Sequence, residues 1–333
     1  AGLAKALIQR QSDTEVSANI CISSNLVLGV IIAILLIQFA DLIAMTVFRD
    51  GRVGPVLEVM SLQIVLGAMS SVHSALLQKH FGFKKLFWVR FVSVSIHGMA
   101  SVPLALYGFG NWALVIGSLV GQVVQVVILW HLSRWRPTIS FDRKIAMELY
   151  EFGAWVSLSG LLIWFYAWAD SLIIGVYLGS EALGLFRIGN QLVVMIFALL
   201  FGPVVPVFYS YCSRISSDSE LIRLASEKIL KILIFFSIPT SVTLYCFSDA
   251  IEAAVFGHEW AGVSLIIKTM ALMHGISWIV GMNGELYRAV GRPSLETIIT
   301  ASTLAIYCVV YFVTVQEGFE VFLWARLALA VGT

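Results

Sequence analysis

The chain has 333 residues, of which 59% are hydrophobic and 12% are charged, and its formal net charge is +1. Soluble domains are about half apolar and one quarter charged, so this composition excludes an ordinary soluble domain. Without a basic tail or arm, the charge gives no sign of a nucleic-acid partner, and we expect none. The four cysteines are scattered without paired spacing and indicate neither disulfides nor a metal site.

Apolar segments of membrane-spanning length recur along the whole chain. A helix needs about 20 apolar residues to cross a bilayer. Nine segments meet this length, at 23–47, 56–77, 87–107, 111–132, 153–178, 185–210, 229–247, 262–284 and 295–315. Apolar pieces at 1–8 and 319–333 are expected to be parts of two further spans. The sequence therefore predicts an all-α, polytopic transmembrane helix bundle that is incomplete at its first helices and at its last helix.

Basic residues are sorted between alternate connections. One set of connections carries sixteen: Lys5, Arg10, Lys79, Lys84, Lys85, Arg90, Arg134, Arg136, Arg143, Lys144, Arg214, Arg223, Lys228, Lys231, Arg288 and Arg292. The other set carries Arg49, Arg52 and, at the edge of a span, Arg187. Because Lys and Arg favour the cytoplasmic side of a membrane, we expect the first set to lie inside a cytoplasmic (inner) membrane that the chain crosses many times.

One short sequence occurs in each half of the chain. "FADLIAMTVF" (Phe39–Phe48) and "FSDAIEAAVF" (Phe247–Phe256) share five of ten positions and lie 208 residues apart. The spans that follow them end near Gly82 and Gly291, which are 209 residues apart. An even number of spans separates the copies, so both face the same way across the membrane. This pattern predicts a parallel repeat, with two bundles related by an axis along the membrane normal.

Several stretches carry a family resemblance. They are "GLAKALIQRQSDTE" (Gly2–Glu15), "LQKHFGFKKL" (Leu77–Leu86), "YGFGNWALVIGSLVG" (Tyr107–Gly121), "ADSLIIGVYLGSEALGLFRIGNQL" (Ala169–Leu192), "VFGHEWAG" (Val255–Gly262) and "RAVGRPSL" (Arg288–Leu295). In this order they resemble the oligosaccharide flippase branch of the multidrug/oligosaccharidyl-lipid/polysaccharide exporter superfamily. The resemblance implies two pseudo-symmetric six-helix lobes around a central cavity. An N-terminal lobe at 1–150 would lack its first helices, and a C-terminal lobe at 151–333 would be truncated.

Polar residues within spans are the candidates for substrate contact. A polar side chain in lipid is costly, and such residues are therefore treated as functional candidates. Asp170 either pairs with backbone donors or with Arg187, or serves as an ion or proton relay in a cavity. Arg187, Asn190 and Gln191 are predicted to share one helix face. Arg187 either binds a phosphate or extends to the outer interface. Family members often carry a further Arg where Gln191 stands.

Further polar residues have mainly structural interpretations. Lys268 is expected to anchor its helix at the outer surface, with a cavity role as the alternative. Gln122 is expected to hydrogen-bond another helix or to line a polar cavity wall, beside the close-packing motif Gly117-x-x-x-Gly121. Pro203 and Pro206 predict a bend. The depth of Arg326 in the last apolar segment is not predicted.

No motif in the sequence indicates an enzyme. A P-loop, a dinucleotide fingerprint and metal-ligand spacing of histidines are all absent, so we expect no catalytic residue, cofactor or metal. The resemblance implies a flippase that moves a lipid-linked (pyrophosphate) oligosaccharide across the cytoplasmic membrane for surface polysaccharide synthesis, by alternating access of two lobes. An H⁺ or Na⁺ gradient, or removal of the product, would drive it. The alternatives are a multidrug/cation antiporter of the same superfamily and a membrane polysaccharide polymerase or ligase.

Overall fold

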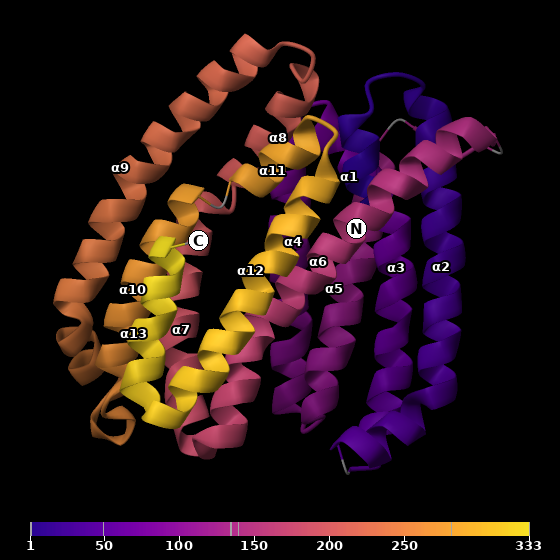
Figure 1. Ribbon diagram of the computed structural model, residues 1–333. Helices are drawn as coiled ribbons and strands as arrows, with labels where there is room; N and C mark the ends of the chain where they lie inside the picture. The colour runs from indigo at the N-terminus through magenta and orange to yellow at the C-terminus, as the bar shows by residue number, and fades with distance from the viewer. Residues whose placement is uncertain (1, 49, 134, 139, 281, 333) are drawn as a thin grey trace. The chain divides into compact units, whose positions relative to one another are not determined.

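The computed structural model describes residues 2–48, 50–133, 135–138, 140–280 and 282–332 (Figure 1). All regular secondary structure in these ranges is helical. Nine of the described helices are long and apolar enough to cross a membrane, which confirms the predicted all-α polytopic bundle. Helices are the expected form, because lipid offers no hydrogen-bond partners and a helix pairs its backbone N–H and C=O groups within itself. Arg49 and Arg134, two of the basic residues used for orientation, lie outside the described residues.

The chain divides into two compact units, Ala1–Ala154 and Trp155–Thr333. Unit 1 contains α1 (Gly2–Gln9), α2 (Thr14–Ile43) with the π-helical turn η1 (Ala44–Phe48), α3 (Val53–Lys79), α4 (Phe83–Leu106), α5 (Asn111–Leu132) and the start of α6 (Arg143–Tyr177). Unit 2 contains the rest of α6, α7 (Gly179–Phe201), α8 (Val204–Arg214), α9 (Ser219–Ile251) with the π-helical turn η2 (Glu252–Phe256), η3 (His258–Trp260), α10 (Val263–Val280), α11 (Asn283–Ala289), α12 (Pro293–Thr314), η4 (Val315–Glu317) and α13 (Phe319–Gly332).

The predicted span 185–210 is broken into two helices. The predicted span 185–210 ends as α7 at Phe201, and α8 begins at Val204. Proline has no backbone N–H to continue the hydrogen-bond ladder, so Gly202-Pro203 separates the two helices, in agreement with the predicted bend. The predicted span 262–284 corresponds to the candidate span Val263–Ala289, which includes α10 and α11.

Within unit 1, the short helix α1 is fastened by a buried lysine. Lys79, the last residue of α3, is 8% exposed. Its Nζ donates to the carbonyl oxygen of Leu7 at 3.1 Å, to the hydroxyl of Thr14 at 3.0 Å and to the carbonyl oxygen of Arg10. The last carbonyls of a helix have no partner within the helix and carry partial negative charge. Lys79 therefore satisfies the C-terminal end of α1 and holds it against α3.

The predicted close-packing motif is confirmed between α4 and α5. A Cβ atom added at Gly121 would lie 2.8 Å from the carbonyl oxygen of Ser93 and 3.1 Å from the Cβ of His97. A Cβ atom at Gly117 would lie 3.0 Å from the carbonyl oxygen of His97. The two glycines of α5 thus let the backbone of α4 approach to contact distance, which is how membrane helices gain packing energy without a hydrophobic driving force.

The local structure of the two units repeats at the positions that the sequence repeat predicts. The π-helical turns η1 and η2 form the last five residues of the two copies of the repeated sequence, with the same spacing of 208 residues. Such turns account for well under one residue in a hundred, so this coincidence of position is informative. The turns that end α3 and α11 also share one hydrogen-bond pattern: Gly82 N donates to Leu77 O at 2.7 Å, and Arg292 N donates to Tyr287 O at 2.8 Å.

The structure corrects the register that the glycines suggested. Gly82 and Gly291 are not equivalent, because the left-handed backbone position in each turn is held by Phe81, with φ 57°, and by Gly291, with φ 78°. These two residues lie 210 apart, not 209. Phe81 adopts a conformation that is costly for a residue with a Cβ atom, whereas Gly291 adopts it freely.

We expect Gly121→Ala to destabilise the helix pair α4–α5, because its methyl group would press on the backbone of α4. Overpacking of this kind costs about 1–3 kcal/mol. The measurement is the midpoint of thermal unfolding of the detergent-solubilised protein, followed by size-exclusion chromatography.

Gly98→Ala is the matched control for Gly121→Ala. Gly98 lies in α4, the other helix of the pair, but a Cβ atom there would meet nothing within 4 Å. This variant should be neutral or stabilising, because alanine is about 1 kcal/mol more favourable than glycine in a helix. Equal losses in the two variants would show that the packing of Gly121 is not the cause.

Candidate functional site

The most deeply buried charges of unit 2 form one ion pair. Arg326 Nη2 of α13 lies 2.7 Å from Asp170 Oδ2 of α6, and the two side chains are 5% and 2% exposed. Arg326 Nη1 also lies 3.1 Å from the sulfur of Met270 in α10. Asp170 Oδ1 accepts a hydrogen bond of 2.6 Å from the backbone N–H of Ser171. The pair therefore joins α6, α10 and α13 at one point.

Aromatic side chains surround this ion pair. The guanidinium carbon of Arg326 lies 5.2 Å from the ring centre of Phe186 in α7. On α12, the ring of Tyr307 lies 5.1 Å from that of Tyr166 and 5.5 Å from that of Tyr311, which in turn contacts Phe322 at 4.9 Å. Where water is excluded in this way, removing one partner of an ion pair leaves an uncompensated charge and is strongly destabilising.

Arg187 does not pair with Asp170, so that interpretation of the sequence was wrong. The Arg187 side chain is exposed, and its guanidinium carbon lies 4.1 Å from the ring centre of Trp168 in α6. Successive residues of a helix are about 100° apart around its axis, so Trp168 and Asp170 point to nearly opposite sides of α6. The sequence neighbours Phe186 and Arg187 are divided in the same way, one buried and one exposed.

An exposed surface of unit 2 thus combines a cation with indole rings. Arg187 covers Trp168, whose ring lies 6.1 Å from that of Trp164 one turn away. Gln191, one turn after Arg187 in α7, is also exposed. We call Trp164, Trp168, Arg187 and Gln191 the arginine surface. Asn190 does not share it fully, because its side chain is half-buried and its Oδ1 lies 3.3 Å from Nε2 of His274 in α10.

Two other predicted residues make structural contacts. Lys268 Nζ of α10 lies 2.8 Å from both carboxylate oxygens of Asp249 in α9, so it joins two helices near their connection. Gln122 lies in unit 1, and its Nε2 donates to the carbonyl oxygen of Gln63 at 2.9 Å. The interpretation of Gln122 as a hydrogen bond between helices is confirmed. The six predicted residues therefore do not form a single cluster.

Arg326 is the residue of this ion pair whose depth and partner the sequence did not predict. An arginine inside an apolar segment was the only signal, and its partner lies 156 residues away in the sequence. As for metals, the part of the chain that the structure describes holds no group of three or more His, Cys, Asp or Glu side chains suited to an ion.

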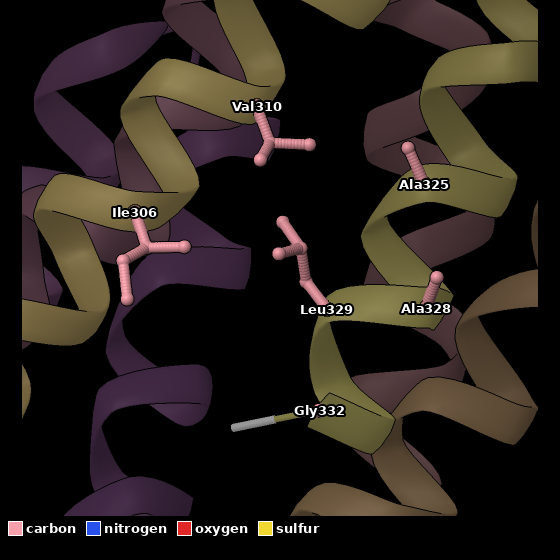
Figure 2. A pocket seen from close by; sticks show the side chains of 6 residues that line it. All are labelled: Ile306, Val310, Ala325, Ala328, Leu329 and Gly332. Atoms are coloured by element: carbon pink, nitrogen blue, oxygen red, sulfur yellow. The ribbon is translucent and has the colours of Figure 1, made fainter.

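An apolar pocket of about 370 Å³ lies between α12 and α13. Its lining consists of Ile306, Val310, Ala325, Ala328, Leu329 and Gly332. Figure 2 shows the side chains of Ile306 and Val310 on one helix facing those of Ala325 and Leu329 on the other. No lining side chain carries a charge or a polar group, so the pocket has no means of holding the charged part of a ligand.

Comparison with known sequences matches a family model described as polysaccharide biosynthesis protein over residues 1–265. The teichuronic acid biosynthesis protein TuaB of Bacillus subtilis (strain 168) is 27% identical, over 95% of this chain and 66% of TuaB. The lipopolysaccharide biosynthesis protein WzxC of Escherichia coli (strain K12) is 22% identical, over 88% of this chain and 57% of WzxC. The succinoglycan biosynthesis transport protein ExoT of Rhizobium meliloti (strain 1021) is 26% identical, over 83% and 56%. The chain spans 56% to 66% of the length of these relatives.

Solved structures with the same fold are transporters. An outward-facing multidrug resistance MATE family transporter of the MOP superfamily has a TM-score of 0.84 at 14% identity, over 99% of this chain and 80% of that chain. A MOP superfamily transporter from Pyrococcus furiosus Vc1 has a TM-score of 0.82 at 14% identity, with the same coverage. The sequence match over residues 1–265 is far longer than half the chain. The chain therefore belongs to the polysaccharide biosynthesis protein family, and it is a multi-pass membrane protein with the fold of MOP superfamily transporters.

Proposed function

We propose that the full-length protein flips a lipid-linked oligosaccharide from the inner to the outer leaflet of the cytoplasmic membrane, for surface polysaccharide synthesis. Family membership supports this proposal, as do relatives that are named for the biosynthesis of teichuronic acid, lipopolysaccharide and succinoglycan. Its mechanism is alternating access, in which the units 1–154 and 155–333 act as two lobes. An H⁺ or Na⁺ gradient, or consumption of the product outside, drives the net movement.

The observation that carries the proposal is the exposed Arg187 within a spanning helix. A charge at such a position is expensive, and it is retained where it serves a pathway. Among the described contacts, Arg187 makes a cation–π contact with Trp168 and no ion pair. A guanidinium stacked on a ring keeps its N–H groups in the plane available, and these bind a phosphate in bidentate fashion. The pyrophosphate of a lipid-linked sugar is such a ligand.

The rest of the arginine surface suits the sugar part of the same substrate. The indoles of Trp164 and Trp168 offer flat apolar faces, and the Gln191 amide offers both a donor and an acceptor for hydroxyl groups. Asp170 takes no part, because its carboxylate is already paired with Arg326. We therefore assign substrate contact to the arginine surface and helix attachment to the ion pair.

The second candidate is a multidrug antiporter, which the fold of the solved MATE structures favours. The charge of the arginine surface speaks against it, because an exposed guanidinium repels cationic drugs and attracts anions. The two functions therefore make opposite predictions for the removal of this charge.

In the full-length protein, Arg187→Ala should reduce export of surface glycan at least about tenfold, because a charge-assisted hydrogen bond to phosphate contributes about 1.5–3 kcal/mol. The measurement is complementation of a bacterial host that lacks its own flippase, scoring surface glycan together with the lipid-linked intermediate that accumulates inside. Membrane insertion is checked by quantifying the protein in isolated membranes.

Arg52→Ala is the control for Arg187→Ala. Arg52 is also exposed, and it pairs with Asp50 in the connection after η1, with a distance of 2.8 Å between Nη2 and Oδ2. Its removal should leave export unchanged. Full activity of Arg187→Ala would take this residue out of the substrate site. Efflux of cationic drugs without rescue of any glycan would replace the flippase by the antiporter.

Asp170→Ala and Arg326→Ala should each lower the stability of the detergent-solubilised protein by about 3–5 kcal/mol, because each leaves a buried charge without its partner. The double variant Asp170→Leu/Arg326→Met should recover most of this loss, since apolar side chains of similar volume replace a buried ion pair at little cost. Thermal unfolding measures all three. A double variant as unstable as the single ones would contradict the pairing.

A further inference from the structure

One end of α4 presents aromatic and basic side chains together. The aromatic residues are Phe87, Trp88 and Phe91, which are 61%, 52% and 54% exposed. Their ring centres lie 5.5 Å apart for Phe87 and Trp88, 5.7 Å for Trp88 and Phe91, and 6.1 Å for Phe87 and Phe91. The basic residues are exposed as well. We call Lys84, Lys85, Phe87, Trp88, Arg90 and Phe91 the α4 patch.

The helix places these residues in an ordered way. At about 100° per residue, Lys84, Phe87, Trp88 and Phe91 fall on one face of α4. Lys85 and Arg90 fall on its two edges, one on each side of the rings. The opposite face carries Val89 and Ser93, which are 2% and 7% exposed and pack against the rest of unit 1. The patch therefore faces away from the rest of unit 1, within a helix of spanning length, Phe83–Leu106.

Among the described residues, no acidic side chain pairs with the basic residues of the patch. The sequence of α4 contains no Asp or Glu. Other basic residues do pair: Arg223 with Glu220 and Glu227, and Arg288 with Glu285 and Glu296. Among the described contacts, none of the three cations of the patch takes part in an ion pair or a hydrogen bond. Three positive charges around a group of rings thus remain available to an anion outside the chain.

The second unit shows that the fold does not need this patch. Counting from the starts of α4 and α12, which lie 210 residues apart, its six positions correspond to Ser294, Leu295, Thr297, Ile298, Thr300 and Ala301. None of these is charged or aromatic. A feature that helix packing required would be expected in both units, so the patch serves a partner of unit 1 alone.

We propose that the α4 patch binds an anionic phospholipid of the inner leaflet. The positive end of α4 lies on the side where basic connections gather, and Lys and Arg stems reach from a helix end to the headgroup level. There Lys84, Lys85 and Arg90 hold the headgroup phosphate, and the rings of Phe87, Trp88 and Phe91 lie along the upper part of an acyl chain. This inference depends on that orientation and not on the proposed flippase function.

A phospholipid is the partner that the position favours. The rings lie within a spanning segment and so face hydrocarbon, where a soluble protein or nucleic acid has no access. Each basic residue near an anionic membrane surface contributes about a fivefold gain in affinity, so three together give about a hundredfold preference for an anionic over a zwitterionic lipid. The three rings contact one another, so they form one continuous surface for an acyl chain, which single aromatic residues scattered along the interface do not.

The test uses the chain reconstituted in phosphatidylcholine vesicles that contain a minor fraction of a brominated lipid, either phosphatidylglycerol or phosphatidylcholine. Bromine quenches indole fluorescence on contact. The quenching of Trp88 is obtained by subtracting the quenching measured in Trp88→Phe from that measured in the unaltered chain. We expect brominated phosphatidylglycerol to quench Trp88 at far lower content than brominated phosphatidylcholine. Lys84→Gln/Lys85→Gln/Arg90→Gln should abolish this preference.

A matched control removes the same charge elsewhere. Arg143→Gln/Lys228→Gln/Lys231→Gln neutralises three exposed basic residues on the same predicted side, outside the patch, and should keep the preference. Equal quenching by the two lipids in the unaltered chain would overturn the proposal, as would equal loss in both triple variants. One further outcome would overturn the proposal. Polyprenyl phosphate would relieve the quenching by brominated phosphatidylglycerol at contents at which unbrominated phosphatidylglycerol does not. The patch would then be a dock for the transport substrate.

Discussion

Hydrocarbon offers no hydrogen-bond partner, so each polar group that this chain places in the bilayer must find one inside the protein. Helices satisfy the backbone, and several of the remaining polar side chains join one helix to another. Ser237 and Ser241 of α9 donate to the carbonyl oxygens of Gly275 and Ala271 in α10, at 2.6 and 2.8 Å. The same constraint accounts for Lys79 at the end of α1 and for the ion pair of unit 2. Polar contacts therefore determine which helices stay together.

The two units meet this constraint with different chemistry at corresponding places. In unit 1, α3 and α5 are joined by neutral groups, with Gln63 Nε2 donating to Ser118 Oγ at 2.7 Å. The residue 208 positions after Ser118 is Arg326, which joins α13 to α10 and α6 by charge. One scaffold thus carries a hydroxyl in one unit and a guanidinium in the other. Unit 2 holds the buried ion pair and the exposed Arg187, while unit 1 holds the buried Lys79 and the α4 patch.

The sequence predicted features that depend on near neighbours along the chain. Apolar segments predicted the nine spans, and Gly117 and Gly121 predicted a close helix contact, because each prediction needs only length or helical spacing. The site was predicted less well. Arg187, the nearest cation in sequence, was one of the alternatives predicted for Asp170, but the side of α6 on which Asp170 lies selects Arg326.

The paired π-helical turns also bear on the history of the chain. A π-turn holds one residue more than an α-helical turn of the same length. If that residue had entered one copy after a duplication, the spacing between the copies would change across the turn, yet it stays at 208 from Phe39 to Phe48. The spacing becomes 210 by the starts of α4 and α12 and returns to 208 at the starts of α5 and α13. Under a duplication, the extra residue of the turn is ancestral, and the two-residue changes were later events in each unit.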